Sequence, residues 1–121
     1  MMPEPWPVEL RQAKDGKSLL VAFDDGTSFT LAAEYLRVES PSAEVKGHGP
    51  GQEQLVTGKQ SVLIERLEPI GTYAVRIHFN DRHSTGLFTW SYLAKLGREH
   101  DTTWQQYLAK LQAAGASRES W

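Results

Sequence analysis

Two Asp-Gly pairs, set between short runs of alternating apolar residues, constrain the fold of this chain more than any other feature. They occur in the segment VELRQAKDGKSLLVAFDDGTSFTLAA, and Asp-Gly between such runs is a strong signal for a β-hairpin. A two-residue turn at the first pair places Leu10 opposite Val21 and Val8 opposite Phe23. The apolar side chains of both strands then share one face, which predicts a half-buried antiparallel pair.

The second Asp-Gly pair requires a different turn. A two-residue turn at this point would break the shared apolar face. A three-residue turn with Gly26 in the left-handed conformation instead pairs Val21 with Phe29 and Leu19 with Leu31. This register keeps the apolar residues of all three strands on one side, and it predicts a three-stranded meander.

The segment SVLIERLEPIGTYAVRIHFND predicts two more strands. A type I turn at EPIG is expected to join them, because a proline followed by a closing glycine suits that turn. Apolar and mostly polar residues alternate in the second strand, as in a half-exposed antiparallel strand. Its apolar positions are Tyr73, Val75, Ile77 and Phe79.

The last third of the chain changes to helical spacing. TWSYLAKLG and TTWQQYLAKLQAAG each repeat Trp and Leu every three or four residues, which favours packing of these side chains in the core. Gly97 and Gly115 are expected to end the two helices, and Asp101 or Thr102 to cap the second. A shorter helix is indicated before Pro41.

Together these elements predict an α+β fold, with a mainly antiparallel sheet of about five strands and C-terminal helices packed on one face. The length fits a single domain, 1–121, in which 98–121 form a C-terminal helix and a frayed tail. Trp6 lies between two prolines. Packing over the sheet edge and exposure for association are both open for its side chain.

Composition excludes several classes of protein. The net charge of −2, from 13 Lys and Arg against 15 Asp and Glu, gives no broad attraction to nucleic acid or to anionic membranes, so neither is an expected partner. The absence of cysteine excludes disulfides, thiolate zinc sites and thiol catalysis. No run approaches the roughly 18 apolar residues of a membrane span, and the N-terminus lacks a secretory pattern. The cytoplasm is the expected compartment.

Several unusual pieces follow one another in order: LRVESPSAEVKGHGPGQ, then Gly58-Lys59, then EPIGTYAVRIHFNDRHSTGLFTWSYL. In this order they resemble the small domain at the N-terminus of γ-butyrobetaine hydroxylase and its relatives, the family also called DUF971. The resemblance covers residues 6–97. In the hydroxylases this domain precedes an oxygenase domain that carries the iron ligands. The resemblance therefore implies that these residues form no enzyme.

The resemblance also points to a small zinc module, with three cysteines in an LRxxCxCxxC segment and a histidine further along. LRVESPSAEV places Ser40, Ser42 and Val45 at the cysteine positions, and His83 matches the histidine. Serine hydroxyls and a valine do not supply the deprotonated sulfur that a structural zinc site needs. No cofactor is therefore expected, and hydrogen bonds and packing are expected to replace the metal.

A metal-binding or metal-delivery role is the alternative. His83 with Asp81 and either His78 or His48 supplies two histidines and one carboxylate, which is an iron-type ligand set, and zinc or iron are the metals to consider. Their spacing matches no recognised signature. His78 and His83 meet only if the chain doubles back after Asn80. The competing interpretation is that His83 makes structural hydrogen bonds.

The irregular stretch 34–52 and the lysine that follows it suggest a surface for a protein partner. The candidate contact residues are Arg37, Glu44, Lys46, His48 and Lys59. Arg37 and Glu44 either present the loop to a partner as a charge pair or clamp it internally. KGHGPGQ lacks the following helix of a phosphate-binding loop.

Three functional hypotheses follow. The preferred one is a non-catalytic binding or adaptor module for another protein, linked to oxygenases or iron–sulfur-cluster proteins, because the family's domain occurs with both. The second is the metal role. The third is a small-molecule site in the loop region for a carnitine-like cation near Trp or Tyr faces. The sequence does not predict the oligomeric state.

Overall fold

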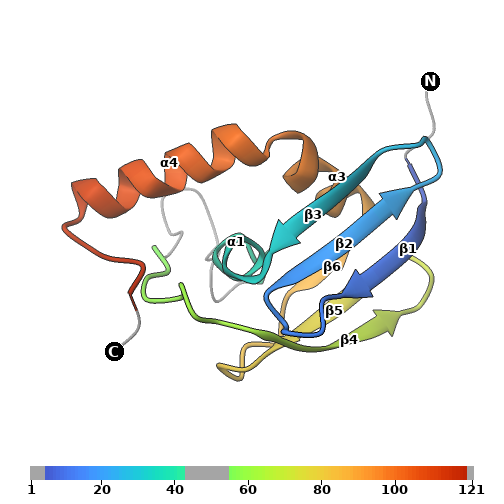
Figure 1. Cartoon of the computed structure of the whole chain (residues 1–121), viewed down its shortest axis with the longest axis horizontal. Coiled ribbons are helices and arrows are strands. Elements are labelled where there is room, and N and C mark those ends of the chain that lie inside the picture. The colour runs from blue at the N-terminus through green and yellow to red at the C-terminus, as the bar shows by residue number, and fades with distance from the viewer. Residues whose placement is uncertain (1–4, 43–54, 120–121) are drawn as a thin grey trace.

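The computed structural model describes residues 5–42 and 55–119, and these form an α+β domain with two antiparallel sheets (Figure 1). Sheet A has the strand order β1-β2-β3 and sheet B the order β4-β5-β6. The elements are β1 (Pro7–Gln12), β2 (Ser18–Phe23), β3 (Ser28–Ala32), α1 (Ala33–Val38), β4 (Ile64–Ile70), β5 (Ala74–Phe79), β6 (Leu87–Thr89), α3 (Trp90–Arg98) and α4 (His100–Ala113). The predicted fold class is confirmed, although the described residues form six strands rather than about five.

The first hairpin has the predicted register over most of its length. Leu10 pairs with Val21, as expected from the first Asp-Gly turn. The predicted pairing of Val8 with Phe23 is wrong, because a bulge places Pro7 opposite Phe23 instead. Val8 is left 65% exposed. Bulges of this kind add one unpaired residue to an edge strand and bend it.

Two glycines with positive φ set the turns of sheet A. Gly16 (φ 74) donates its backbone N–H to the carbonyl of Ala13, so the first turn is longer than the predicted two-residue turn. Gly26 (φ 87) closes the second turn in the predicted left-handed conformation. Phe29 therefore lies opposite Val21, as expected for a three-residue loop.

The turn between β4 and β5 lies three residues beyond its predicted place. Pro69 belongs to β4 and pairs with Val75, and the chain reverses at 71–73, where Gly71 has φ 53. Proline is tolerated because β4 is an edge strand. Tyr73 is consequently in the turn and 54% exposed, rather than on the apolar face. The other predicted apolar positions, Val75, Ile77 and Phe79, are buried.

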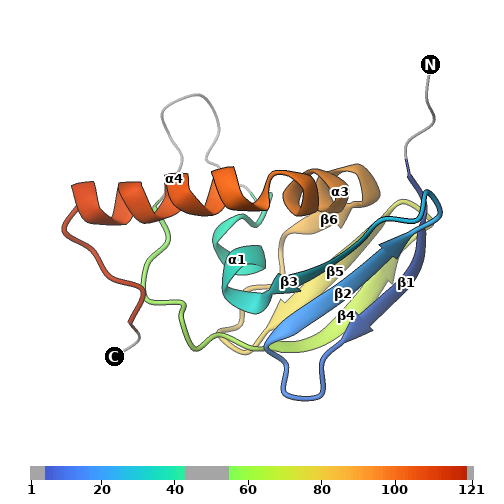
Figure 2. The same ribbon diagram turned by 45° about the horizontal axis from the view of Figure 1, so that its top comes forward.

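Helix α3 lies over the sheets, and α4 continues from it beyond them, above α1 (Figure 2). The short helix before Pro41 is confirmed as α1. Helix α4 starts at His100 after Glu99, so the predicted caps Asp101 and Thr102 already lie inside it. Gly115 (φ 65) follows the last turn of α4, as predicted.

No helix in the described residues is long and apolar enough to cross a membrane.

Gly97 was expected to end a helix, but it lies inside α3. A Cβ atom at this position would overlap the ring of Phe29 on β3. Glycine is therefore required by the close approach of α3 to sheet A, and the sequence pattern alone does not reveal this tertiary reason.

We expect Gly97→Ala to lower the free energy of unfolding by about 1–3 kcal/mol, because an added methyl group overpacks the contact with Phe29. The same change at an exposed site inside a helix would stabilise it by about 1 kcal/mol. Urea unfolding followed by circular dichroism measures the difference. Gly97→Ala at or above wild-type stability would show that α3 and β3 are not packed this closely.

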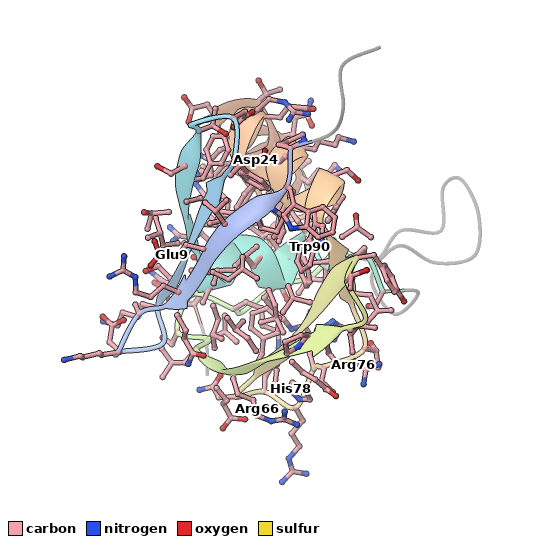
Figure 3. The ribbon with its side chains drawn as sticks, turned by 90° about the vertical axis from the view of Figure 1, so that its right-hand side faces the viewer. Glu9, Asp24, Arg66, Arg76, His78 and Trp90 are labelled. Carbon is pink, nitrogen blue, oxygen red and sulfur yellow. The ribbon has the colours of Figure 1, made fainter. Side chains whose placement is uncertain are left out.

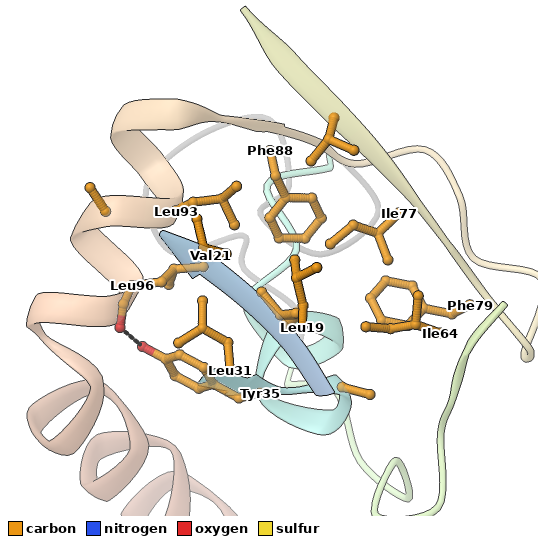
Figure 4. Packing of buried hydrophobic residues seen from close by; sticks show 14 of the residues in the cluster. Leu19, Val21, Leu31, Tyr35, Ile64, Ile77, Phe79, Phe88, Leu93 and Leu96 are labelled. Carbon is orange, nitrogen blue, oxygen red and sulfur yellow. Dashed lines mark hydrogen bonds between the residues drawn. The ribbon is translucent and has the colours of Figure 1, made fainter. Parts of the chain in front are cut away.

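The core lies between the two sheets and the helices (Figure 4). The hydroxyl of Tyr35, on α1, donates a 2.7 Å hydrogen bond to the carbonyl of Leu96, on α3. The two sheets meet where the side chain of Gln12 donates to the carbonyl of Ile64, at 2.8 Å. The core therefore joins elements from both halves of the chain.

The predicted fraying of the C-terminal tail is wrong for residues 116–119. The guanidinium of Arg118 donates two hydrogen bonds, of 2.8 and 2.7 Å, to the carboxylate of Glu34, which is only 7% exposed. The backbone N–H groups of Gly58 and Gln60 donate to carbonyls of the tail. A buried carboxylate needs such a partner, and this requirement fixes the tail against α1.

Candidate functional site

A tight turn after β5 carries both Asp81 and His83. The backbone N–H of Phe79 donates to the carbonyl of His83, and that of Arg82 donates to the carbonyl of Phe79. Arg82 adopts a positive φ of 71°, which is uncommon for a residue other than glycine. These hydrogen bonds place the side chain of Asp81 close to Arg37, in the last turn of α1, and that of His83 close to Ser40 and Ser42, which follow α1.

His83 is buried against two serines. Its Nε2 atom lies 2.8 Å from Ser40 Oγ and 3.5 Å from Ser42 Oγ. His83 is 5% exposed, and Ser40 has no exposed surface. A side chain at Gly86 would overlap Ser40 Oγ, so glycine leaves the space for this hydrogen bond. The positions that match two cysteines and the histidine of the zinc module therefore converge, while Val45 lies outside the described residues.

Asp81 is the acceptor for two cations. Its Oδ2 atom lies 2.8 Å from Arg37 Nε and 2.6 Å from Lys59 Nζ, and its Oδ1 atom accepts the backbone N–H of His83. Burial raises the pKa of Asp81, but the hydrogen bonds from Lys59, Arg37 and His83 outweigh it and bring the pKa to about 2. The carboxylate is thus ionised at neutral pH.

These contacts tie both sides of the segment 43–54 to one turn. Ser40 and Ser42 precede the segment and contact His83, while Lys59 follows it and contacts Asp81. Arg37 and Lys59, two of the predicted partner-contact residues, thus form an internal clamp. Among the described residues, the carboxylate that Arg37 contacts is Asp81. The other three predicted contact residues, Glu44, Lys46 and His48, lie outside the described residues.

The described residues do not form the proposed iron-type ligand set. His78 Nε2 is 2.9 Å from Glu68 Oε1, so its ring pairs across β4 and β5 rather than with His83. No group of three metal-ligating side chains occurs within 5–42 and 55–119. The alternative set with His48 includes a residue outside those ranges.

Zinc does not fit the residues around His83. Ser40 and Ser42 offer hydroxyl oxygens, and a structural zinc site needs thiolate or imidazole ligands. The Nε2 atom that would face the metal already shares a hydrogen bond with Ser40 Oγ. This contact joins the two segments through a hydrogen bond.

The distance between Ser40 and His83 is that of a nucleophile and its base, but the two residues are 43 positions apart in the sequence, so no motif reveals the pair. Ser40 Oγ, however, lies beneath Gly86 and has no exposed surface. A substrate carbonyl does not reach a buried hydroxyl in this arrangement. The pair therefore acts as a structural hydrogen bond.

Aromatic side chains form a second site, which the sequence did not reveal. Trp6 and Tyr73 are 52% and 54% exposed, and the ring centroids of Trp6 and Trp90 lie 6.4 Å apart in an edge-to-face contact. Figure 3 views this end of the molecule, where the indole N–H of Trp90 donates to the carbonyl of Thr72 at 2.8 Å. Three separate segments meet here, which explains why no motif predicted the site.

These aromatic residues border a shallow pocket of about 370 Å³. Its described lining residues are Pro5, Trp6, Tyr73, Thr89, Trp90 and Ser91. We call this group the aromatic pocket. All of its described lining residues lie outside the stretch 34–52, in which the sequence had placed a small-molecule site.

Comparison with known proteins identifies the family. The sequence pattern of the family described as "Gamma-butyrobetaine hydroxylase-like, N-terminal" matches residues 10–94. No match is found among curated proteins.

Solved structures give close matches. One protein with an NMR solution structure is 43% identical, with a TM-score of 0.84, over 97% of this chain and 92% of the other. A second NMR structure is 45% identical, with a TM-score of 0.82, over 99% and 92%.

A third match is a crystal structure of a DUF971-family protein of unknown function from Acidithiobacillus ferrooxidans. It is 41% identical, with a TM-score of 0.63, over 75% of this chain and 91% of the other. The family match lies within the predicted range 6–97 and covers β2 to β6 and the end of β1, together with the clamp at Asp81 and the Ser40–His83 pair. The chain belongs to the γ-butyrobetaine hydroxylase-like N-terminal family, also called DUF971.

Proposed function

We propose that this domain is a non-catalytic protein-binding module and that the aromatic pocket is its contact surface. The observation that carries the proposal is the exposure of Trp6 and Tyr73 beside Trp90. Trp and Tyr are the residues most enriched at the energetic centres of protein interfaces. An apolar surface of this kind on a small domain is typical of an interaction site.

One edge strand of each sheet, β1 in sheet A and β4 in sheet B, favours recognition through side chains rather than through strand addition. β1 carries Pro7 and a bulge between Pro7 and Glu9, and β4 carries Pro69 and a bulge between Ile64 and Arg66. Prolines and bulges block the pairing of a further strand. A partner is therefore expected to insert a side chain into the aromatic pocket.

The family suggests which partners to seek. Its name refers to the N-terminal region of a hydroxylase, so an oxygenase is one class of partner. Iron–sulfur-cluster proteins are the second class, because the resemblance links the domain to them as well. In either case the partner supplies the catalytic chemistry, and this domain supplies a rigid contact surface.

The test is affinity purification of the tagged chain from its native cells, beside the double variant Trp6→Ala/Tyr73→Ala. We expect at least a tenfold loss of the specific partner, because each truncated anchor at an interface centre costs about 2 kcal/mol or more. Leu55→Ala is the matched control, since Leu55 is also an exposed apolar residue but lies outside the pocket. Full retention of the partner by a folded double variant would contradict the proposal.

A further inference from the structure

The outward face of sheet B carries a compact group of basic side chains. Register places Arg66 opposite His78 and Glu68 opposite Arg76, so these four residues share one face of β4 and β5. Figure 3 shows Arg66, Arg76 and His78 on the side of the sheet turned away from the core. We call these four residues the basic face.

Glu68 is the only acidic residue among the four residues of the basic face. Glu68 Oε1 lies 2.9 Å from His78 Nε2 and 3.7 Å from Arg76 Nη1. A hydrogen bond from His78, followed by the charges of Arg76 and Arg66, lowers the pKa of Glu68. Within the ranges that the structure describes, no salt bridge involves Arg66.

Arg76 also has an unused hydrogen-bond donor. Its Nε atom is buried and has no acceptor among the described residues, although the side chain as a whole is 38% exposed. A buried donor without an acceptor is costly. The exposed part of the Arg76 side chain remains open to an incoming carboxylate, and arginine binds carboxylates strongly through its N–H groups.

The basic face is continuous with the aromatic pocket. Ala74 pairs with Thr89, which lines the pocket, and Arg76 pairs with Leu87. Alternate residues of a strand share a face, so Thr89, Arg76 and His78 form one row that leads away from the pocket. Ala74 and His78 are four positions apart on the strand, which corresponds to about 13 Å.

We infer that this surface binds an extended, acidic segment of a partner protein, with an apolar residue in the aromatic pocket and carboxylates along the basic face. The inference rests on the proposed function and specifies the chemistry of the partner. A segment of about five residues spans the distance from the pocket to the far end of the basic face. Protein is favoured over nucleic acid, because a chain with a net charge of −2 gives no broad attraction to a phosphate backbone.

The test uses the full chain and two synthetic peptides, Phe-Asp-Glu-Asp-Glu and its uncharged counterpart Phe-Asn-Gln-Asn-Gln. Tryptophan fluorescence reports binding, because Trp6 and Trp90 border the pocket. We expect the acidic peptide to bind at least tenfold more tightly at low salt, and the difference to shrink as salt is added. Equal binding of the two peptides would overturn the inference.

Variants test the contribution of the basic face to peptide binding. Arg66→Gln/Arg76→Gln is expected to remove the preference for the acidic peptide, while Lys110→Gln, on the distant helix α4, leaves the preference intact. Circular dichroism confirms that each variant is folded. Loss of the preference in the Lys110 control, or its survival in the double variant, would overturn the inference. Tighter binding of a single-stranded oligonucleotide than of the acidic peptide would also overturn it.

The outcomes for the proposed function and for this inference are distinguishable. Suppose that Trp6→Ala/Tyr73→Ala loses the native partner and Arg66→Gln/Arg76→Gln fully retains it. The proposed protein-binding function is then supported, and the inference that the partner segment is acidic is wrong. If Trp6→Ala/Tyr73→Ala retains the partner, the proposed function itself fails.

Discussion

Replacing Asp81 by alanine is expected to lower the free energy of unfolding by about 3 kcal/mol. Arg37 and Lys59, whose side chains are only 12% and 25% exposed, would lose the carboxylate that both contact. Removing one partner of a buried ion pair costs about 3–5 kcal/mol, and partial exposure places this case at the lower end. Urea unfolding at neutral pH measures the effect.

Two variants control for this effect. Glu65→Ala removes an exposed carboxylate from the neighbouring strand and is expected to change stability by no more than about 0.5 kcal/mol. Asp81→Asn keeps a hydrogen-bond acceptor and is expected to fall between wild type and alanine. If Asp81→Ala lost less than about 1 kcal/mol, Asp81 would not hold the two sides of the segment together.

The pH dependence of stability gives an independent measurement of the same residue. Folding lowers the pKa of Asp81 from 3.8 to about 2, so the folded state favours the ionised form. The contribution is therefore complete above about pH 4 and is lost as the pH falls towards 2, by about 2 kcal/mol in total. We expect Asp81→Ala to lack this part of the acid-induced loss. Parallel profiles for wild type and variant between pH 4 and 2 would contradict the low pKa.

Replacing Phe88 by alanine is expected to be similarly severe, at about 3–5 kcal/mol. Phe88 has no exposed surface and lies in the main core cluster, and its ring contacts that of Tyr92 on α3 with centroids 6.1 Å apart. Alanine would leave a cavity. β6 and α3 cannot both move in to fill it, because β6 ends at Thr89 and α3 begins at the next residue, Trp90.

Thermal and urea unfolding of Phe88→Ala measure this loss. Phe88→Leu retains most of the volume and is expected to cost no more than about 1.5 kcal/mol. Tyr73→Ala removes an exposed aromatic ring from the turn between β4 and β5 and should change stability by about 0.5 kcal/mol or less. Equal losses for the alanine and leucine variants at Phe88 would show that the site does not depend on volume.

The candidate site was only partly predictable from the sequence. The resemblance to the zinc module brought Ser40, Ser42 and His83 into one group, and the structure places the three together. The partner of Arg37 was not predictable, because Asp81 is 44 residues away and no local pattern joins them. The aromatic pocket was missed for the same reason, since Trp6, Tyr73 and Trp90 come from separate segments.

Local structure could be predicted from the amino-acid sequence alone: the three-residue turn at Gly26, the register of Leu10 with Val21, and the left-handed glycine after α4. Backbone sterics and the alternation of apolar residues act over a few positions, so one sequence is enough to reveal them. Only the tertiary structure decided why Gly97 lies inside α3, which carboxylate Arg37 contacts, and that Arg118 fixes the tail to Glu34. These outcomes depend on close packing and on pairing buried charges across long stretches of chain, and such requirements exist only once the chain has folded.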